Sequence, residues 1–352
     1  MGMAFPILQI DEFLAFANSG DYVIVDARSE SEFAHAHIPG AINIPILNDE
    51  ERRLVGTEYK QKGKEAAVHL GFRLVGPRFH EIITDTISRA GKNNLLLYCW
   101  RGGMRSNILG WLLSINGFRV KLLNGGYKSF RNYVLNTNAQ PRKFIVLGGA
   151  TGSGKTATLA HLTALGQTVI DLEALANHKG SAFGLLGKGK QPSNEQFENR
   201  LALKLKSIDQ DDWIWVENES RTIGSCALPE AFYSQMRESP VLELKVPLEV
   251  RMKRITKEYG SFSIEELTHC SEKVKKRMGP QNLKLALELL HSGDFPGWLT
   301  LIMEYYDRQY SYGNEQRDSK TIFPIETDME NINLLAQSLV DKKSMILKQF
   351  NG

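Results

Sequence analysis

Short apolar runs alternate with helical patterns along the first 136 residues. Each run has four or five residues, the length of a buried strand, and stretches with apolar residues at helical spacing separate most of them. The expected strands span residues 22–25, 41–45, 95–98 and 119–123. Strands that alternate with helices predict a parallel sheet, so we expect an α/β domain here.

A second α/β pattern follows a polar segment that contains Pro141. Residues 137–142 have the composition of a linker, which divides the chain into expected domains at 1–136 and 143–352. The second domain has a glycine-rich loop and an expected helix from Lys155, and from Pro247 onward it is mainly helical in pattern. Its expected strands span residues 144–147, 168–170, 213–216 and 241–246.

The composition is that of an ordinary folded protein, with 42% hydrophobic and 24% charged residues in 352. No run of eighteen apolar residues predicts a membrane span, and the first residues lack a signal-peptide pattern. The three cysteines, Cys99, Cys226 and Cys270, are too few and too widely spaced for a disulfide framework or a zinc site. We therefore expect a cytoplasmic protein without a membrane partner.

The net charge of +3 does not by itself indicate a nucleic-acid-binding protein. Residues 251–280, however, contain eight Lys or Arg against four Glu. Within that stretch Lys273, Lys275 and Lys276 are candidates for contacts with nucleic-acid phosphates. A solvated helix face is the alternative explanation.

Cys99 lies where the expected strand 95–98 turns into an apolar helix. At that edge of a parallel sheet, α/β proteins usually bind ligands. The residues of the candidate anion cradle are Trp100, Arg101, Gly102, Gly103, Met104 and Arg105. Two glycines let backbone N–H groups converge on one point, and the helix N-terminus adds partial positive charge, which favours a reactive thiolate. A lone cysteine is more commonly buried and inert, but the loop favours the reactive role.

Upstream of this loop lie Asp26, Arg28 and the string His-Ile-Pro-Gly-Ala-Ile-Asn-Ile-Pro at residues 37–45. In their identity and order these residues resemble the rhodanese family. For Asp26 and His37 we expect a bracing role in the fold rather than a chemical one.

The cysteine loop differs from that of ordinary thiosulfate rhodaneses in length. Five residues separate Cys99 from Arg105, as in the Cys-x5-Arg loop of cysteine phosphatases. We expect Arg101 and Arg105 to hold a tetrahedral phosphate, so a donor that carries phosphate beside sulfur or selenium fits.

The glycine-rich segment of the second domain predicts a phosphate-binding loop. It matches G-x-x-x-x-G-K-[ST] between an expected strand and an expected helix. Backbone amides would surround a phosphate, Lys155 would reach it, and Thr156 would hold Mg²⁺. A glycine turn without a ligand is a much less common explanation of this motif in this context. The expected phosphate-binding residues are Gly149, Thr151, Gly152, Ser153, Gly154, Lys155 and Thr156.

Several side chains after the neighbouring strands are further candidates for a substrate or metal site. Asp171 and Glu217 each follow an expected strand and could orient Mg²⁺ through water, although a helix cap or a surface ion pair explains either equally well. Glu219, Ser220 and Arg221 follow the same strand as Glu217.

Two other segments of the second domain have weaker signals. Residues 178–184 are too rich in glycine and small residues for a core, so we expect either a ligand-lining loop or an ordinary surface loop. Arg251 and Arg254 lie on a predicted helix, where nucleotide kinases often place phosphate-contacting arginines. A solvated face is the commoner explanation for them.

Taken with both loops, the strings at residues 56–61, 177–184 and 217–224 resemble the bacterial tRNA 2-selenouridine synthase family over nearly the whole chain. The resemblance implies a rhodanese-like α/β domain followed by a P-loop α/β domain with a helical C-terminal part. It also implies replacement of sulfur by selenium in the wobble 2-thiouridine of tRNA. Selenophosphate would donate selenium, Cys99 would carry it as a perselenide, and geranyl diphosphate would supply a geranyl group that makes sulfur a better leaving group.

The same resemblance sets the expected cofactors and partners. No tightly bound cofactor is expected, and Mg²⁺ would accompany the diphosphate. The expected partners are tRNA with wobble 2-thiouridine and an enzyme that supplies selenophosphate.

Three alternatives stay open at the level of sequence. The first is a P-loop kinase of a small molecule or RNA with a regulatory rhodanese domain. The second makes Cys99 a phosphatase nucleophile, and the third is a non-catalytic persulfide carrier that binds tRNA. ATP consumption without tRNA would favour the kinase, and release of phosphate from an aryl phosphate would favour the phosphatase.

Overall fold

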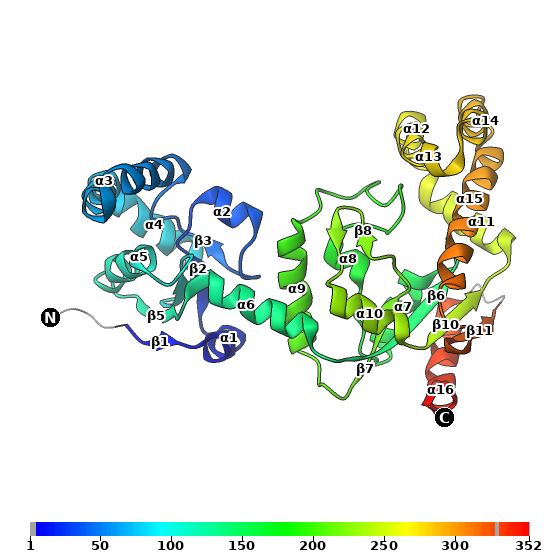
Figure 1. Ribbon diagram of the computed structural model, residues 1–352, viewed down its shortest axis with the longest axis horizontal. Coiled ribbons are helices and arrows are strands. Elements are labelled where there is room, and N and C mark those ends of the chain that lie inside the picture. Colours follow the sequence, from blue (N-terminus) through cyan, green and yellow to red (C-terminus); the bar gives the residue numbers. More distant parts are fainter. Residues whose placement is uncertain (1–4, 328–330, 352) are drawn as a thin grey trace. The chain divides into compact units, whose positions relative to one another are not determined.

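The computed structural model describes residues 5–327 and 331–351 (Figure 1). It forms two compact units. Unit 1 consists of Met1–Thr137 and Glu195–Leu203, and unit 2 of Asn138–Asn194 and Lys204–Gly352.

Unit 1 is built on a sheet of five parallel strands in the order β1-β5-β4-β2-β3. The strands are β1 (Ile7–Leu8), β2 (Val23–Asp26), β3 (Ile42–Asn43), β4 (Asn94–Tyr98) and β5 (Arg119–Leu123). The helices are α1 (Ile10–Asn18), α2 (Glu30–His35), α3 (Asp49–Val75), α4 (Phe79–Ala90), α5 (Met104–Ser114) and α6 (Gly126–Ala139). The four strands predicted for this half are confirmed, and β1 is an addition that only two residues form.

The central strand β4 shows why this sheet is buried on both faces. Leu95 and Leu97 pack into the core on one face, whereas Leu96 and Tyr98 pack into the core on the other. All four side chains are fully buried. A continuous apolar run is therefore what this position requires, and the carboxyl end of β4 leads directly to Cys99.

A helix from the second half of the chain completes unit 1. Residues Glu195–Leu203 of α9 (Asn194–Lys206) belong to this unit. Glu195 accepts a 2.7 Å hydrogen bond from the hydroxyl of Tyr127, and Arg131 donates one of 2.6 Å to Glu198. The division predicted at residues 137–142 did not anticipate that residues 195–203 belong to unit 1. Helix α6 ends at Ala139 and β6 begins at Lys143, so 140–142 alone lies between them.

Unit 2 has a sheet of four parallel strands in the order β11-β10-β6-β7 and a small antiparallel pair, β8 and β9. The strands are β6 (Lys143–Gly149), β7 (Trp213–Glu217), β8 (Thr222–Ile223), β9 (Cys226–Ala227), β10 (Val241–Lys245) and β11 (Ile322–Glu326). The helices are α7 (Lys155–Ala164), α8 (Leu172–Ala176), α10 (Glu230–Glu238), α11 (Leu248–Tyr259), α12 (Ile264–Lys273), α13 (Lys275–Met278), α14 (Pro280–His291), α15 (Phe295–Glu315) and α16 (Ile332–Asn351).

Two predictions about the strands of unit 2 need correction. The run 168–170 forms a single bridge, between Val169 and Trp215, rather than a strand. Strand β11 was not predicted, because Pro324 interrupts its apolar run and the surrounding pattern is helical. Proline is tolerated there because β11 lies at the edge of the sheet.

The described residues of unit 2 include two large apolar cores. One lies between the sheet and helices α7 and α16 and includes Leu159 and Leu335. The other is formed largely by helices α11 to α15, which gather together in Figure 1, and centres on the fully buried Trp298. Among the described residues, no helix is both long and apolar enough to cross a membrane.

Candidate functional site

The loop after β4 places the sulfur of Cys99 at the start of α5. Cys99 is 3% exposed, and its Sγ accepts a 3.3 Å hydrogen bond from the backbone N–H of Gly103. The hydroxyl of Ser106, in the first turn of α5, lies 3.3 Å from the same atom. Helix N-termini carry partial positive charge, so this position favours an anion on or beside the sulfur.

Close backbone packing holds the cysteine loop in place. Gly102 has φ +64°, and an added Cβ would lie 2.8 Å from the carbonyl oxygen of Leu123. The backbone N–H of Tyr127 donates a 2.8 Å hydrogen bond to the carbonyl of Cys99. The glycine is thus required by a close approach to the end of β5, in line with its predicted role in curling the loop.

The two arginines of the predicted phosphate clamp are arranged differently from each other. Arg105 donates a 2.6 Å hydrogen bond to Glu32, which also forms a 2.9 Å ion pair with Arg52. Burial raises the pKa of Glu32, but these two guanidinium groups lower it by a larger amount, so the net shift is downward. Arg101 is exposed. The clamp predicted from Arg101 and Arg105 is not formed in this structure, because the guanidinium group of Arg105 pairs with the carboxylate of Glu32.

Arg28 is an important residue of this site for which the sequence predicted no role beyond the family pattern. Its guanidinium is buried, binds both oxygens of Asp26 at 2.6 to 3.0 Å and lies 3.9 Å from the ring centre of Tyr127. Burial lowers the pKa of Arg28, but the hydrogen bond and charge of Asp26 outweigh that effect and raise it. Asp26 therefore braces a buried cation, as its predicted structural role requires.

A polar cavity of about 360 Å³ opens beside the cysteine loop. Arg28 and Trp100 line it together with the Glu32 and Arg52 pair. Trp100 is 40% exposed, so its ring offers a flat apolar surface next to these charges. The cavity can accept a planar polar group close to the loop that carries Cys99.

The predicted phosphate loop has the expected form in unit 2. It connects β6 to α7, and Gly149, Gly152 and Gly154 all have positive φ angles. Lys155 donates a 2.7 Å hydrogen bond to the carbonyl of Gly149, so its ammonium group is folded back over the loop. Ser153 is buried, and its hydroxyl has no hydrogen-bond partner in the part of the chain that the structure describes.

The arginines of α11 support this loop rather than forming a solvated face. Arg254 donates a 2.8 Å hydrogen bond to the carbonyl of Ser153. Arg251 donates one of 3.1 Å to the carbonyl of Thr151 and binds both oxygens of Asp307. Both side chains therefore hold the shape of the phosphate loop.

Carboxylates surround the cation of Lys155. Glu217, at the end of β7, is fully buried, and neither of its oxygens has a hydrogen-bond partner among the described residues. Burial first, and then the charge of Glu173, raise the pKa of Glu217 well above its usual range. The same two causes raise the pKa of Glu219 to about 7, partly opposed by Lys155.

Two further carboxylates near the phosphate loop, Glu173 and Asp171, make different contacts. Thr156 donates a 3.1 Å hydrogen bond from its hydroxyl to Glu173, a residue that the sequence did not single out. Burial raises the pKa of Glu173, and the charge of Lys155 partly offsets the rise. Asp171 caps α8 by accepting a 2.7 Å hydrogen bond from the N–H of Ala174, and a helix cap was one of the roles considered for it.

No group of three or more His, Cys, Asp or Glu within the described ranges is arranged as a complete metal site. The orphaned oxygens of Glu217 and the hydroxyl of Thr156 nevertheless fit a cation whose other ligands are phosphate oxygens and water. Hard oxygen ligands of this kind are those that Mg²⁺ prefers.

Other predicted residues lie in less specific surroundings. Arg221 forms a 2.6 Å ion pair with Glu230, and both side chains are more than half exposed. Ser220 donates a hydrogen bond to the carbonyl of Thr222. The segment 178–184 is not purely a surface loop, because Phe183 is fully buried in the helical core of unit 2.

The three lysines predicted to contact nucleic acid are all exposed. Lys273 ends α12, and Lys275 and Lys276 begin α13. Their positions are compatible with phosphate contacts and equally with a solvated face.

Comparisons with known proteins identify both units. Residues 9–133 match the model of the rhodanese-like domain, and residues 142–340 match the model described as the tRNA 2-selenouridine synthase AAA domain. The chain is 37% identical to the tRNA 2-selenouridine synthase of Pseudomonas fluorescens (strain Pf0-1), a match that covers 86% of this chain and 91% of that protein. It is 35% identical to the enzyme of that name from Sulfurovum sp. (strain NBC37-1), over 85% of this chain and 91% of the relative.

The chain therefore belongs to the class of proteins that join a rhodanese-like domain with a cysteine loop to a second α/β domain with a phosphate loop. The extent of the matches then decides the family. The chain belongs to the tRNA 2-selenouridine synthase family.

Proposed function

We propose that this protein replaces sulfur by selenium in the wobble 2-thiouridine of tRNA, through an intermediate in which the sulfur carries a geranyl group. The observation that carries this proposal is the pairing of two different loops in one chain. One presents the sulfur of Cys99 to a helix N-terminus, and the other places Lys155 near the buried Glu217 and the partly buried Glu173 and Glu219.

The phosphate loop of unit 2 is proposed to bind geranyl diphosphate. Lys155 would leave the carbonyl of Gly149 and stabilise the departing diphosphate as the sulfur of 2-thiouridine takes the geranyl group. Thr156 and Glu217 would hold Mg²⁺, which supplies positive charge to the phosphate oxygens when bound.

Electron counting limits what Cys99 can carry. Selenium in selenophosphate is already at the oxidation level of selenide, so a perselenide on Cys99 requires a two-electron oxidant. The perselenide predicted from the sequence stays a prediction that depends on such an oxidant.

A route without an oxidant also uses Cys99. The selenium of selenophosphate attacks C2 of the base, the C2–S bond breaks, and geranyl thiolate leaves and takes a proton. The thiolate of Cys99 then attacks phosphorus and the Se–P bond breaks. Its electron pair, left on selenium, forms the C2=Se bond while the C2=N3 pair moves to N3, which takes a proton. Water hydrolyses the cysteinyl phosphate that results. The Gly103 N–H and the α5 N-terminus would stabilise anionic charge beside Sγ during the transfer.

One reconstitution tests the proposal. The purified protein is incubated with Mg²⁺, geranyl diphosphate, selenophosphate and an anticodon stem-loop RNA that contains 2-thiouridine, and the nucleosides are analysed by mass spectrometry. Geranylated 2-thiouridine should appear first and 2-selenouridine afterwards. Absence of both products, combined with ATP consumption that needs no RNA, would instead identify a P-loop kinase.

A further inference from the structure

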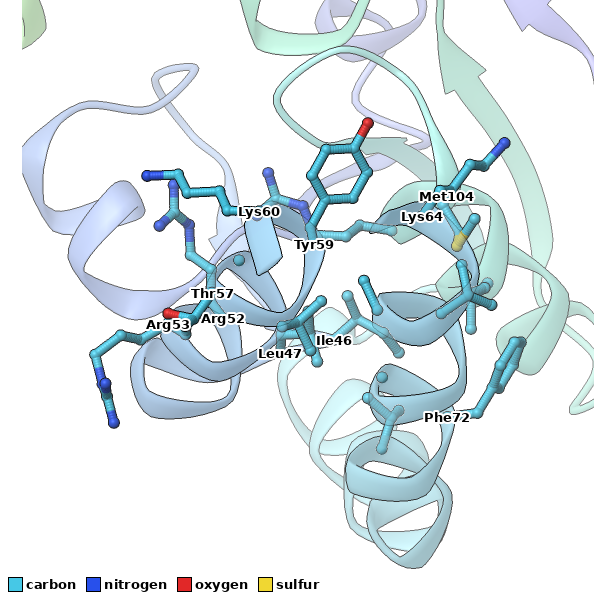
Figure 2. A pocket seen from close by; sticks show the side chains of 18 residues that line it. Ile46, Leu47, Arg52, Arg53, Thr57, Tyr59, Lys60, Lys64, Phe72 and Met104 are labelled. Atoms are coloured by element: carbon cyan, nitrogen blue, oxygen red, sulfur yellow. The ribbon is translucent and has the colours of Figure 1, made fainter. Parts of the chain in front are cut away.

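A second cavity of unit 1, of about 860 Å³, lies against the folded helix α3 (Figure 2). Gly63 interrupts α3 with φ 87° and ψ −175°, so its two helical arms can fold around a hollow. Residues 46–47 before the helix and residues of α5 close the remaining sides. The volume is within the range of about 300–1,000 Å³ that small-molecule pockets usually have.

The lining of this cavity is mainly apolar. Ile46 and Ala67 are buried in its wall. Tyr59, Phe72 and Met104 line it while 58%, 50% and 46% exposed. Several large apolar side chains left exposed around one hollow indicate that a ligand or partner covers them.

The rim of the cavity is cationic. Arg52, Arg53 and Arg105 line it, but each pairs with a glutamate of unit 1. Lys60 and Lys64 also line it, and neither forms an ion pair within residues 5–327 and 331–351. In Figure 2 their side chains extend away from the apolar residues Ile46 and Leu47. Two free ammonium groups therefore suit an anionic ligand with an apolar part.

The position of the cavity links it to the cysteine loop. Trp100, at one end of that loop, lines the polar cavity of about 360 Å³, whereas Met104 and Arg105, at the other end, line the apolar cavity. Arg52 lines both. A ligand whose reacting atom lies near Cys99 can thus place a planar polar group in one cavity and an apolar chain in the other.

We propose that the apolar cavity of unit 1 binds the ten-carbon prenyl chain of the S-geranylated nucleotide while selenium replaces its sulfur. Lys60 and Lys64 contact RNA phosphates beside that nucleotide. This inference rests on the proposed function, because it assigns the intermediate a binding site separate from the phosphate loop. A free prenyl diphosphate and a second copy of the chain are the competing occupants.

The test uses a variant that fills the cavity and a control on the same helix. Val68 is half-buried and lines the cavity, so Val68→Trp occupies its volume. Gln61 is exposed and does not line the cavity, so Gln61→Trp is the control. Selenium transfer is measured with two stem-loop RNAs, one carrying S-geranyl-2-thiouridine and the other S-methyl-2-thiouridine.

The expected result is selective for the long chain. Val68→Trp should raise KM for the geranylated RNA about tenfold or more and leave KM for the methylated RNA unchanged, because only the geranyl group reaches the cavity. Gln61→Trp should change neither value. An equal effect of Val68→Trp on both RNAs, or no effect on either, would overturn the assignment.

A second measurement excludes misfolding and the competing donor site. With 2-thiouridine RNA and geranyl diphosphate, Val68→Trp should still form the geranylated nucleoside at the normal rate and with normal KM for the diphosphate. A raised KM for geranyl diphosphate would assign the cavity to the donor instead. Failure of the unmodified protein to convert either S-alkylated RNA would reject the proposed function itself, a result distinct from loss of selectivity.

Discussion

The cysteine loop of unit 1 and the phosphate loop of unit 2 share one local architecture and differ in their electrostatics. Each follows a parallel strand, contains glycine with positive φ and leads into a helix. Near Cys99 the carboxylate of Glu32 is matched by two arginines, and that of Asp26 by Arg28. Around Lys155 the carboxyl groups of Glu173, Glu217 and Glu219 all have raised pKa values.

The difference suggests what each loop needs in order to bind its substrate. Carboxylates with raised pKa values lack enough positive charge nearby, so the phosphate loop is suited to a cation together with a phosphate. The carboxylates near the cysteine loop are already paired with arginines, so this loop can accept an anion beside sulfur without a metal. Local geometry is thus common to both loops, and the surrounding charges distinguish their ligands.

The largest expected effect comes from removal of the nucleophile. Cys99→Ser should abolish selenium incorporation, because its sulfur alone among the three cysteines lies at the start of a helix that follows a strand of the sheet. Cys226→Ser and Cys270→Ser, which alter buried thiols in unit 2, should leave incorporation intact. Quantification of 2-selenouridine by mass spectrometry checks all three, and full incorporation by Cys99→Ser would refute its role.

The second expected effect concerns the phosphate loop. Lys155→Ala should slow geranylation of 2-thiouridine RNA by about a hundredfold to a thousandfold, the usual loss when one preorganised charge-stabilising group is removed. Single-turnover rates with saturating geranyl diphosphate measure this step. Normal geranylation by Lys155→Ala would assign the loop to ATP or selenophosphate.

A smaller effect is expected from the basic surface of α12 and α13. Joint charge reversal at Lys273, Lys275 and Lys276 should weaken tRNA binding and reduce the slope of log affinity against log salt by about 1 for each RNA phosphate that a lysine no longer neutralises. Lys284→Glu, on the exposed face of α14, is the control. An unchanged slope in the triple variant would show that tRNA binds elsewhere.

The smallest expected effect is on stability. Because the pKa of Glu219 is about 7 in the folded protein and its ordinary value is 4.5, the folded state binds more protons between these values. The unfolding free energy should therefore fall as pH rises through that window, by on the order of 2 kcal/mol. Glu219→Gln should remove this part of the decline, and Glu238→Gln, an exposed carboxylate, should not. Denaturant unfolding at pH 5 and pH 8 without Mg²⁺ gives the unfolding free energy at each pH. An equal change in that free energy for both variants would contradict the raised pKa of Glu219.

The sequence predicted the α/β fold and the place of both loops well, because each depends on short-range patterns. An apolar run followed by glycines and a basic residue is visible in the chain itself, as at 95–105 and 144–156. The family resemblance then supplied the proposed chemistry. The predicted roles of the individual site residues remain predictions.

Long-range contacts were less accessible to prediction. The pairing of Arg105 with Glu32, the support of the phosphate loop by Arg251, and the place of Glu195 in unit 1 all join residues more than 60 positions apart. The cavity at α3 was also missed, since its lining mixes apolar residues with lysines that individually resemble a solvated helix. Short-range periodicity does not reveal contacts of this kind.

The division of labour between the two loops is tested most directly by the nucleosides that Cys99→Ser produces. The variant is given 2-thiouridine RNA, geranyl diphosphate, Mg²⁺ and selenophosphate, and the RNA is digested and analysed by mass spectrometry. We predict that the RNA stalls after geranylation, as geranylated 2-thiouridine or as the Se-phosphoryl nucleoside formed from it, and that no 2-selenouridine forms, because the phosphate loop is intact. RNA that contains only unmodified 2-thiouridine would contradict the separation of the two steps, and so would 2-selenouridine at the normal level.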